Sequence, residues 1–186
     1  MASYDEGKQE IVEWIRKNFP HGSTCLDVGA CDGKWKSLLG DYLVMDACEI
    51  WWPNIEGHEL ARKYRKVIHM DIVDYAYPFY DLVIFGDVIE HMDIAKAQKV
   101  LAYADEHSRD MVVGVPYRYK QGALYGNPNE EHIQDDLTAE IMAERYPGLE
   151  LILQARGDYG YYHSRPPLSE IVAISIIDRR VNCKLT

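Results

Sequence analysis

The sequence CLDVGACDG at residues 25–33 is a short apolar run that leads directly into a glycine-containing turn. We expect Cys25–Val28 to form a buried β-strand and the residues after Gly33 to begin a helix. Gly29 and Gly33 allow the backbone of the turn to approach a ligand more closely than side chains would permit. This segment therefore predicts a strand–turn–helix unit with a ligand at the turn.

A second acidic residue supports a nucleotide-binding unit. Glu49 ends the next apolar run, Leu43–Glu49, and lies 22 residues after Asp27. In nucleotide-binding βαβ units, a carboxylate about 20 residues beyond the glycine-rich turn binds ribose hydroxyls. The spacing indicates an adenosine-type cofactor, although a glycine turn taken alone is also compatible with an ordinary tight turn.

The composition narrows the class of protein. The chain has 186 residues, of which 47% are hydrophobic and 27% charged, and its formal net charge is −10. This length suits one domain, residues 1–186, with a sizeable core. A strongly negative chain repels polyanions, so we expect no nucleic-acid partner. The densest basic run, residues 62–66, is interpreted as the solvated face of a helix.

Neither a membrane nor an oxidising compartment is expected. The sequence contains no run of about 20 apolar residues, and residues 1–6 are acidic rather than signal-like. Its four cysteines form no CxxC pair and no Cys/His ligand pattern. We therefore expect a cytoplasmic protein with reduced thiols and no membrane partner.

Strands and helices alternate along most of the chain, which predicts a parallel sheet with helices on both faces. The last two strands, separated by a loop over residues 155–170, predict an antiparallel edge pair. The predicted fold class is α/β, a doubly wound, mostly parallel seven-stranded sheet with an antiparallel terminal strand. After the first two strands, the others are Lys66–His69, Tyr80–Phe85, Met111–Val115, Leu149–Gln154 and Ile171–Ile177, and the helices cover 5–18, 34–39, 53–64, 93–107 and 138–146.

The fourth strand continues into the sequence GDVIEH at residues 86–91. This block, the first turn, Glu49 and the pair Asp71-Ile72 occur in an order that resembles the class I S-adenosylmethionine-dependent methyltransferases over roughly residues 22–154. The block is similar to that of the type-11-like branch, and further runs resemble a compact, largely uncharacterised subgroup of it. The resemblance implies a Rossmann-like methyltransferase fold and S-adenosyl-L-methionine as cofactor.

The resemblance also implies roles for individual residues around the glycine turn. Gly29, Ala30 and Gly33 belong to the turn, and the backbone of the first two would contact the methionine end of the cofactor. Asp27 would orient the turn. The family usually has a third glycine where this chain has Cys31. The Cys31 side chain would either crowd the methionine moiety or point away from it.

The adenosine end of the cofactor would be held by residues that follow the next strands. By the same resemblance, Glu49 would accept hydrogen bonds from the ribose hydroxyls. Ile50 and Ile72 would sandwich the adenine, and Asp71 would accept from its exocyclic amine. Asp87 would lie at the carboxyl end of the fourth strand, at the crevice where open α/β sheets bind ligands.

Two histidines are candidate catalytic residues. His91 follows Asp87 by four residues and would either face the methyl acceptor or cap the next helix. His132 lies in the long segment 117–136, which lacks periodicity, and loops of this kind often contact substrate. A plain surface histidine is the alternative. Tyr117, Tyr119 and Tyr125 would either wall the acceptor pocket or fix the loop.

No metal site is predicted. Glu90, His91 and Asp93 lie close together in the sequence, but adjacent residues at a helix start do not share one face. The aromatic segment 158–163 is interpreted as a lid, a homodimer contact or an ordered surface loop.

The favoured function is methyl transfer to a small-molecule or sugar-like (carbohydrate) acceptor. A NAD-dependent oxidoreductase would share the βαβ unit but requires a complete G-x-G-x-x-G turn, which residues 29–34 do not supply. A non-catalytic cofactor-binding module remains a third hypothesis. The acceptor atom, whether oxygen, nitrogen or carbon, does not follow from these motifs.

Overall fold

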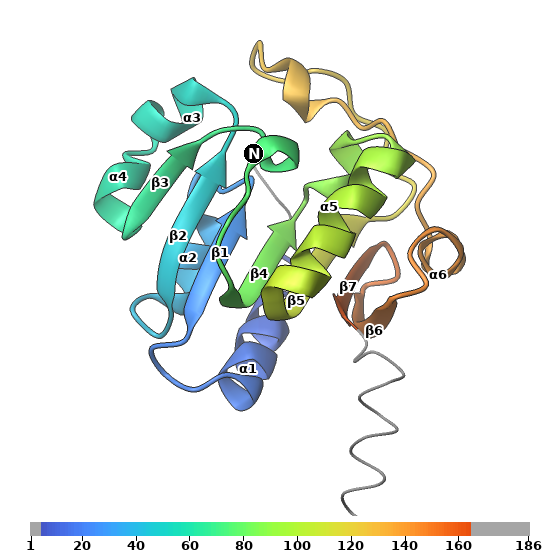
Figure 1. The fold of residues 1–186 in the computed structure, drawn as a ribbon. Coiled ribbons are helices and arrows are strands. Elements are labelled where there is room, and N and C mark those ends of the chain that lie inside the picture. The colour runs from blue at the N-terminus through green and yellow to red at the C-terminus, as the bar shows by residue number, and fades with distance from the viewer. Residues whose placement is uncertain (1–4, 165–186) are drawn as a thin grey trace, which may run out of the picture.

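The computed structural model describes residues 5–164, which form a seven-stranded sheet in the order β3-β2-β1-β4-β5-β7-β6 (Figure 1). Strands β1 to β5 are mutually parallel, whereas β7 runs antiparallel to both β5 and β6. This confirms the predicted doubly wound sheet. The strands are β1 Thr24–Val28, β2 Val44–Glu49, β3 Lys66–His69, β4 Tyr80–Gly86, β5 Ser108–Pro116, β6 Leu149–Ala155 and β7 Tyr159–Ser164.

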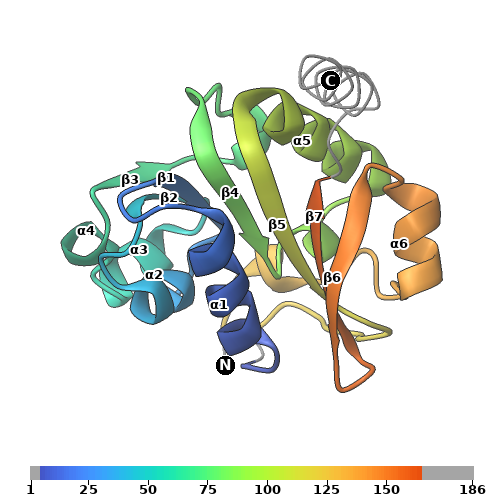
Figure 2. The ribbon, with the colours of Figure 1, turned by 90° about the horizontal axis from the view of Figure 1, so that it is seen from below.

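Helices cover both faces of the sheet, and Figure 2 shows α1 and α5 on opposite sides of it. The α-helices are α1 Lys8–Asn18, α2 Lys34–Leu39, α3 Trp52–Gly57, α4 Leu60–Lys63, α5 Ile94–His107 and α6 Ala139–Arg145. Three short 3-10 turns are η1 Ile72–Asp74, η2 Ile89–His91 and η3 Pro128–Glu130. Within residues 5–164, no helix has the length and apolar composition that a membrane crossing requires.

Strand β4 lies in the middle of the sheet, and its side chains contribute to a separate apolar cluster on each face. Leu82 and Ile84 lie in the cluster formed with α1 to α4, whereas Val83 and Phe85 lie in the cluster formed with α5 and α6. Successive residues of a strand point to opposite faces, so an unbroken apolar run is what burial on both faces requires. The run at 80–85 therefore identified the middle of the sheet.

The predicted terminal strands need correction. The loop expected over residues 155–170 contains strand β7, which pairs with β6 from Ala155↔Tyr159 to Leu149↔Ser164. The connection is a short turn in which Arg156 and Gly157 both have positive φ angles of 46° and 86°. Tyrosine-rich segments favour strands, and the turn at Gly157 was the available signal. The strand predicted at Ile171–Ile177 lies outside the described residues.

The helix predicted over residues 53–64 is two helices in the structure. Helix α3 ends at Gly57, and α4 begins at Leu60. Between them, Glu59 has a φ of 51°, which an α-helix cannot contain. The glycine at position 57 weakens the helix at this point, and the break sets α4 at a position where Tyr64 reaches the end of β1.

Candidate functional site

A cavity of about 730 Å³ lies at the carboxyl ends of the parallel strands. Strand β1 has β2 on one side and β4 on the other, so the chain reverses direction across the sheet at this point. Open α/β sheets bind ligands at such a switch point. Of the predicted site residues, Gly29, Glu49, Ile50, Asp71, Ile72, Asp87, His91 and His132 line the cavity.

Glu49 ties the end of β2 to the turn after β1. One carboxylate oxygen accepts a hydrogen bond from the Cys31 backbone N–H at 2.8 Å, and the other accepts from Trp51 N–H at 2.7 Å. The side chain is buried, and burial raises its pKa, partly offset by these two bonds. Each carboxylate oxygen retains a further acceptor site. Glu49 is therefore an acceptor group held rigidly in the cavity wall.

The turn itself depends on Gly29. Its φ is 65°, and a Cβ at this position would lie 2.8 Å from the Val88 side chain. Cys31 also has a positive φ, 46°, and lines the cavity. Ala30 and Gly33 are not among the lining residues. Ala30 belongs to the core beside α1, and Gly33 precedes the first residue of α2.

Asp27 lies behind the turn rather than in the cavity wall. Its side chain is 1% exposed and accepts a hydrogen bond from the Tyr64 hydroxyl. Burial raises the pKa of Asp27 to about 7, although the Tyr64 bond opposes the shift. This carboxyl group thus connects β1 to the residue after α4, a contact that the sequence spacing did not indicate.

Ile50, Asp71 and Ile72 form the part of the wall that follows β2 and β3. Asp71 accepts a hydrogen bond from Val73 N–H at 3.0 Å and caps η1. Ile72 is buried, whereas Ile50 is 40% exposed. One oxygen-bearing residue and two aliphatic side chains therefore line the same end of the cavity.

Asp87 occupies a buried ionic network at the carboxyl end of β4. One oxygen accepts a hydrogen bond from the Tyr159 hydroxyl at 2.7 Å, and the other lies 3.6 Å from the Lys8 ammonium group. Lys8 is 1% exposed, and its ammonium group lies 5.3 Å from the centre of the Trp35 ring. Burial raises the pKa of Asp87, and Lys8 opposes this. Neither Lys8 nor Tyr159 was among the predicted site residues.

His91 and His132 meet in the cavity wall, with their ring centroids 4.7 Å apart in an edge-to-face arrangement. The His91 Nδ1 lies 3.1 Å from the Glu131 carbonyl oxygen, and the His132 Nδ1 lies 2.7 Å from the Tyr119 carbonyl oxygen. Burial lowers the pKa of both histidines, which favours the neutral imidazole form. The structure thus brings together two residues that were predicted as separate candidates.

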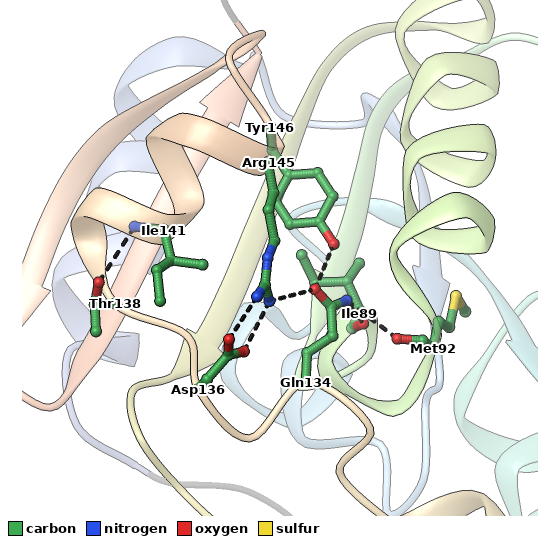
Figure 3. A network of polar contacts seen from close by, with 8 residues as sticks. All are labelled: Ile89, Met92, Gln134, Asp136, Thr138, Ile141, Arg145 and Tyr146. Carbon is green, nitrogen blue, oxygen red and sulfur yellow. Dashed lines mark hydrogen bonds and ion pairs between the residues drawn. The ribbon is translucent and has the colours of Figure 1, made fainter.

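Gln134 anchors the loop that carries His132 (Figure 3). Its amide nitrogen donates to the carbonyl oxygens of Ile89 at 2.8 Å and Met92 at 3.1 Å. Its amide oxygen accepts from the Tyr146 hydroxyl at 2.9 Å and from Arg145 at 3.1 Å. This side chain is 4% exposed, and it links the loop to both η2 and α6.

The loop tyrosines have different surroundings. Tyr119 lines the cavity beside His132, with ring centroids 5.4 Å apart. Tyr117 is buried and its hydroxyl bonds that of Tyr162 in β7, so it fixes the loop to the sheet. Tyr125 is 83% exposed and is not a lining residue.

Glu90 lines the cavity from η2 and is 0% exposed. Neither of its carboxylate oxygens has a hydrogen-bond partner among residues 5–164. Burial raises its pKa well above the usual value, and the nearby Asp87 carboxylate raises it further. A buried carboxylate in this state is uncommon in proteins. The sequence analysis did not assign Glu90 to the site.

No protein-family model matches the sequence, and no curated protein is similar to it. An S-adenosylmethionine-dependent methyltransferase from Clostridium acetobutylicum superposes with a TM-score of 0.66 at 12% identity, over 88% of this chain and 93% of that chain. The N-methyltransferase NodS from Bradyrhizobium japonicum, in complex with S-adenosyl-L-homocysteine, superposes with a TM-score of 0.64 at 15% identity, over 86% of each chain.

Magnesium protoporphyrin IX methyltransferase (ChlM) from Synechocystis, with bound S-adenosyl-L-homocysteine, gives a TM-score of 0.61 at 14% identity. That superposition covers 85% of this chain and 83% of ChlM. Identities this low carry information on architecture alone. The chain therefore has the fold of the class I S-adenosylmethionine-dependent methyltransferases, as its motifs predicted.

Proposed function

We propose that this protein is an S-adenosylmethionine-dependent methyltransferase that acts on a small-molecule acceptor. The observation that carries the proposal is that Glu49 and the Gly29 turn line one cavity at the switch point of the sheet. Three structures with this fold are methyltransferases by name, and two of them hold S-adenosyl-L-homocysteine.

The residues present fit an adenosyl cofactor. The cavity volume of about 730 Å³ lies within the range of small-ligand sites, roughly 300–1,000 Å³. A side chain at Gly29 would collide with Val88, and because Gly29 lines the cavity, it is backbone that this position presents to a ligand. Glu49 offers two fixed acceptor oxygens in a buried wall, as two adjacent hydroxyl groups require.

Each part of the cofactor has a proposed partner. Glu49 accepts from the ribose hydroxyls, Ile50 and Ile72 hold the adenine between them, and Asp71 accepts from its amine. The methionine end lies along the turn backbone at Gly29 and Ala30, where Gly33 closes the turn. Asp27 lies behind the turn and orients it, and its own carboxyl group is held by the Tyr64 hydroxyl. Asp87 faces the same crevice with its charge balanced by Lys8.

The acceptor is proposed to enter beneath the loop that follows β5. Pro116, Tyr119 and Gln121 line this side of the cavity. Aromatic and amide side chains of this kind suit a small polar molecule, including a sugar-like one. The negative net charge of −10 disfavours a polyanionic acceptor such as nucleic acid.

When bound, the cofactor supplies an electrophilic methyl group. The cavity walls would position an acceptor relative to that methyl group, and positioning of this kind supplies up to about 7–11 kcal/mol of barrier reduction. His91 and His132 remain the proposed catalytic residues, because burial favours their neutral form and both face the same cavity. A neutral imidazole accepts a proton from an acceptor hydroxyl group within hydrogen-bond reach.

We also propose a cytoplasmic location. Cys25, Cys31 and Cys48 are free thiols in the structure, and free thiols persist in reducing compartments.

Calorimetric titration of the full chain with S-adenosylmethionine, S-adenosyl-L-homocysteine and NAD tests the proposed function. We expect one binding site for each of the first two ligands and none for NAD. Binding of NAD alone would overturn the proposal in favour of an oxidoreductase. Binding of none of the three would remove the cofactor assignment altogether.

A further inference from the structure

Glu90, His91 and His132 form a cluster of three metal-ligating groups in the cavity wall. Each residue offers one ligand atom, and all three atoms lie within 4.8 Å of one another. Two of the residues come from η2 and the third comes from the loop after β5. The sequence pattern of Glu90, His91 and Asp93 had argued against a metal site. In the structure, Asp93 caps α5 instead, and His132 joins the other two residues.

The surroundings of the Glu90 carboxyl group suit a metal ligand. The carboxylate is fully buried, and neither oxygen has a hydrogen-bond partner among residues 5–164. A buried carboxyl group without a hydrogen-bond partner is unfavourable in either protonation state, and buried carboxylates are normally paired or bound to a metal. The neighbouring cation, Lys8, is engaged with Asp87. Glu90 therefore has acceptor capacity, close to the ring nitrogens of His91 and His132, that no group among residues 5–164 uses.

The two histidines are oriented as metal ligands are. Each ring holds a backbone carbonyl oxygen at Nδ1, from Glu131 for His91 and from Tyr119 for His132. A carbonyl oxygen only accepts hydrogen bonds, so each Nδ1 carries the proton and each Nε2 has a free lone pair. Metal-binding histidines typically donate their second N–H to a carbonyl or carboxylate oxygen in this way, which fixes the ring.

The backbone around the cluster is rigid. The Glu90 carbonyl oxygen accepts from the N–H groups of both Ile133 and Gln134, at 2.8 and 2.9 Å. The residue after His132 is therefore bonded directly to the residue before His91. The Gln134 amide holds the same two segments together through Ile89. The geometry of the three ligands is thus set by main-chain bonds rather than by the ligands themselves.

We propose that Glu90, His91 and His132 bind a divalent first-row transition-metal ion. Imidazole and carboxylate ligands together suit ions of this class. Ligand atoms about 2.1 Å from one tetrahedral ion lie about 3.4 Å apart, so a spacing within 4.8 Å closes with side-chain movements of up to about 1 Å. Three protein ligands leave coordination positions open to a molecule in the cavity.

An ion at this position places a Lewis acid beside the space proposed for the acceptor. An acceptor oxygen bound to it would lose its proton more readily, and the histidines would then serve as ligands rather than bases. The metal site itself does not depend on the proposed methyl transfer, because ion binding is measured without S-adenosylmethionine.

Titration of the chelator-treated full chain with Co²⁺ tests the site. We expect one ion per chain, visible absorption bands of nitrogen-ligated Co²⁺, and two paramagnetically shifted, solvent-exchangeable N–H signals in the proton NMR spectrum. The two signals arise from the Nδ1–H groups of His91 and His132. Glu90→Gln, His91→Ala and His132→Ala should each weaken Co²⁺ binding at least tenfold, and each histidine variant should lose one signal.

His107→Ala is the matched control. The His107 Nδ1 also lies close to a carbonyl oxygen, that of Tyr103 at 2.9 Å, but this residue is not part of the cluster. Its replacement should leave Co²⁺ binding unchanged. Circular dichroism checks that each variant is folded, and His132→Ala, in a loop, serves if Glu90→Gln does not fold. Less than one ion per wild-type chain, or equal affinity of the wild type and the three cluster variants, would overturn the proposal.

Discussion

His91 and His132 are 41 positions apart in the chain, yet their rings lie edge to face with centroids 4.7 Å apart. Neither residue is held by the other. Each is fixed by a backbone carbonyl oxygen, and the loop between β5 and α6 is fixed to η2 by Gln134. The arrangement of the two rings therefore depends on how the loop is anchored.

Gln134→Met should reduce the free energy of unfolding by about 2–3 kcal/mol. The substitution keeps the length of the side chain but leaves the buried Tyr146 hydroxyl without its acceptor and removes one of the two donors to the Ile89 carbonyl, and unsatisfied buried groups are costly. Urea unfolding measures the loss. Gln98→Met is the control, because Gln98 is exposed and makes one hydrogen bond, to Arg145. Equal losses for the two variants would contradict the anchoring role.

Lys8→Met should reduce the free energy of unfolding by about 3 kcal/mol at pH 8. The substitution leaves the Asp87 carboxylate in the cavity wall without its cation, and breaking a buried ion pair is strongly destabilising. Lys8 lowers the pKa of Asp87, so without it the carboxyl group protonates more readily. The loss should therefore be smaller at pH 5 than at pH 8.

Urea unfolding at both pH values measures the effect of Lys8→Met. Lys17→Met, at an exposed position of the same helix, should change stability by less than about 0.5 kcal/mol. Adding Asp87→Asn to Lys8→Met should restore part of the lost stability at pH 8. A double variant that is less stable than Lys8→Met would show that the charge of Asp87 is balanced by another group.

Asp27→Asn should change how stability depends on pH. Burial raises the folded-state pKa of Asp27 to about 7, whereas the unfolded value is about 3.9. The folded protein thus binds the Asp27 proton more tightly than the unfolded chain does. The stability that this proton contributes is complete below pH 4 and is lost as the pH rises through 7. The wild type should lose stability relative to Asp27→Asn between pH 4 and pH 8, by on the order of 4 kcal/mol.

Thermal and urea unfolding of both proteins across this pH range measures the difference. The asparagine still accepts from the Tyr64 hydroxyl, so the variant should fold. Asp74→Asn, at an exposed position, controls for the loss of one negative charge and should follow the wild-type profile. Parallel profiles for Asp27→Asn and the wild type would mean that Asp27 is ionised in the folded protein throughout.

The parts of the fold that could be predicted from the sequence are those set by local pattern. The apolar run at 80–85 must be buried on both faces, and the glycine turn at 29–33 must bend sharply, so both were found. Strand β7 was missed because residues 155–170 were interpreted as one loop, although its tyrosines favour a strand and Gly157 marks the turn before it. The break between α3 and α4 depends on the positive φ of Glu59, and a glutamate in the sequence does not indicate a positive φ.

The missed parts of the site depend on contacts between distant segments. Lys8 looks like a surface lysine at the start of an amphipathic helix, and only the folded sheet brings it to Asp87 and Tyr159. The partnership of Glu90 with His132 likewise requires the loop after β5 to return to η2. Glu49, by contrast, was identified because its distance from the turn is a property of one βαβ unit.

The account depends most on Glu49 as the group that binds the cofactor ribose. Glu49→Gln places an NH₂ group where the structure has an acceptor facing the N–H of Cys31 or Trp51, and it removes the charge that strengthens hydrogen bonds to hydroxyl groups. The loss of binding free energy for the cofactor should be on the order of 2 kcal/mol. Glu56→Gln, at an exposed position of α3, makes the same chemical change outside the cavity.

Calorimetric titration of wild type, Glu49→Gln and Glu56→Gln with S-adenosyl-L-homocysteine tests this claim most directly, with circular dichroism as the check on folding. We predict that Glu49→Gln weakens binding at least tenfold and that Glu56→Gln binds as the wild type does. Equal affinity of all three proteins would contradict the account, because the ribose would then be held elsewhere.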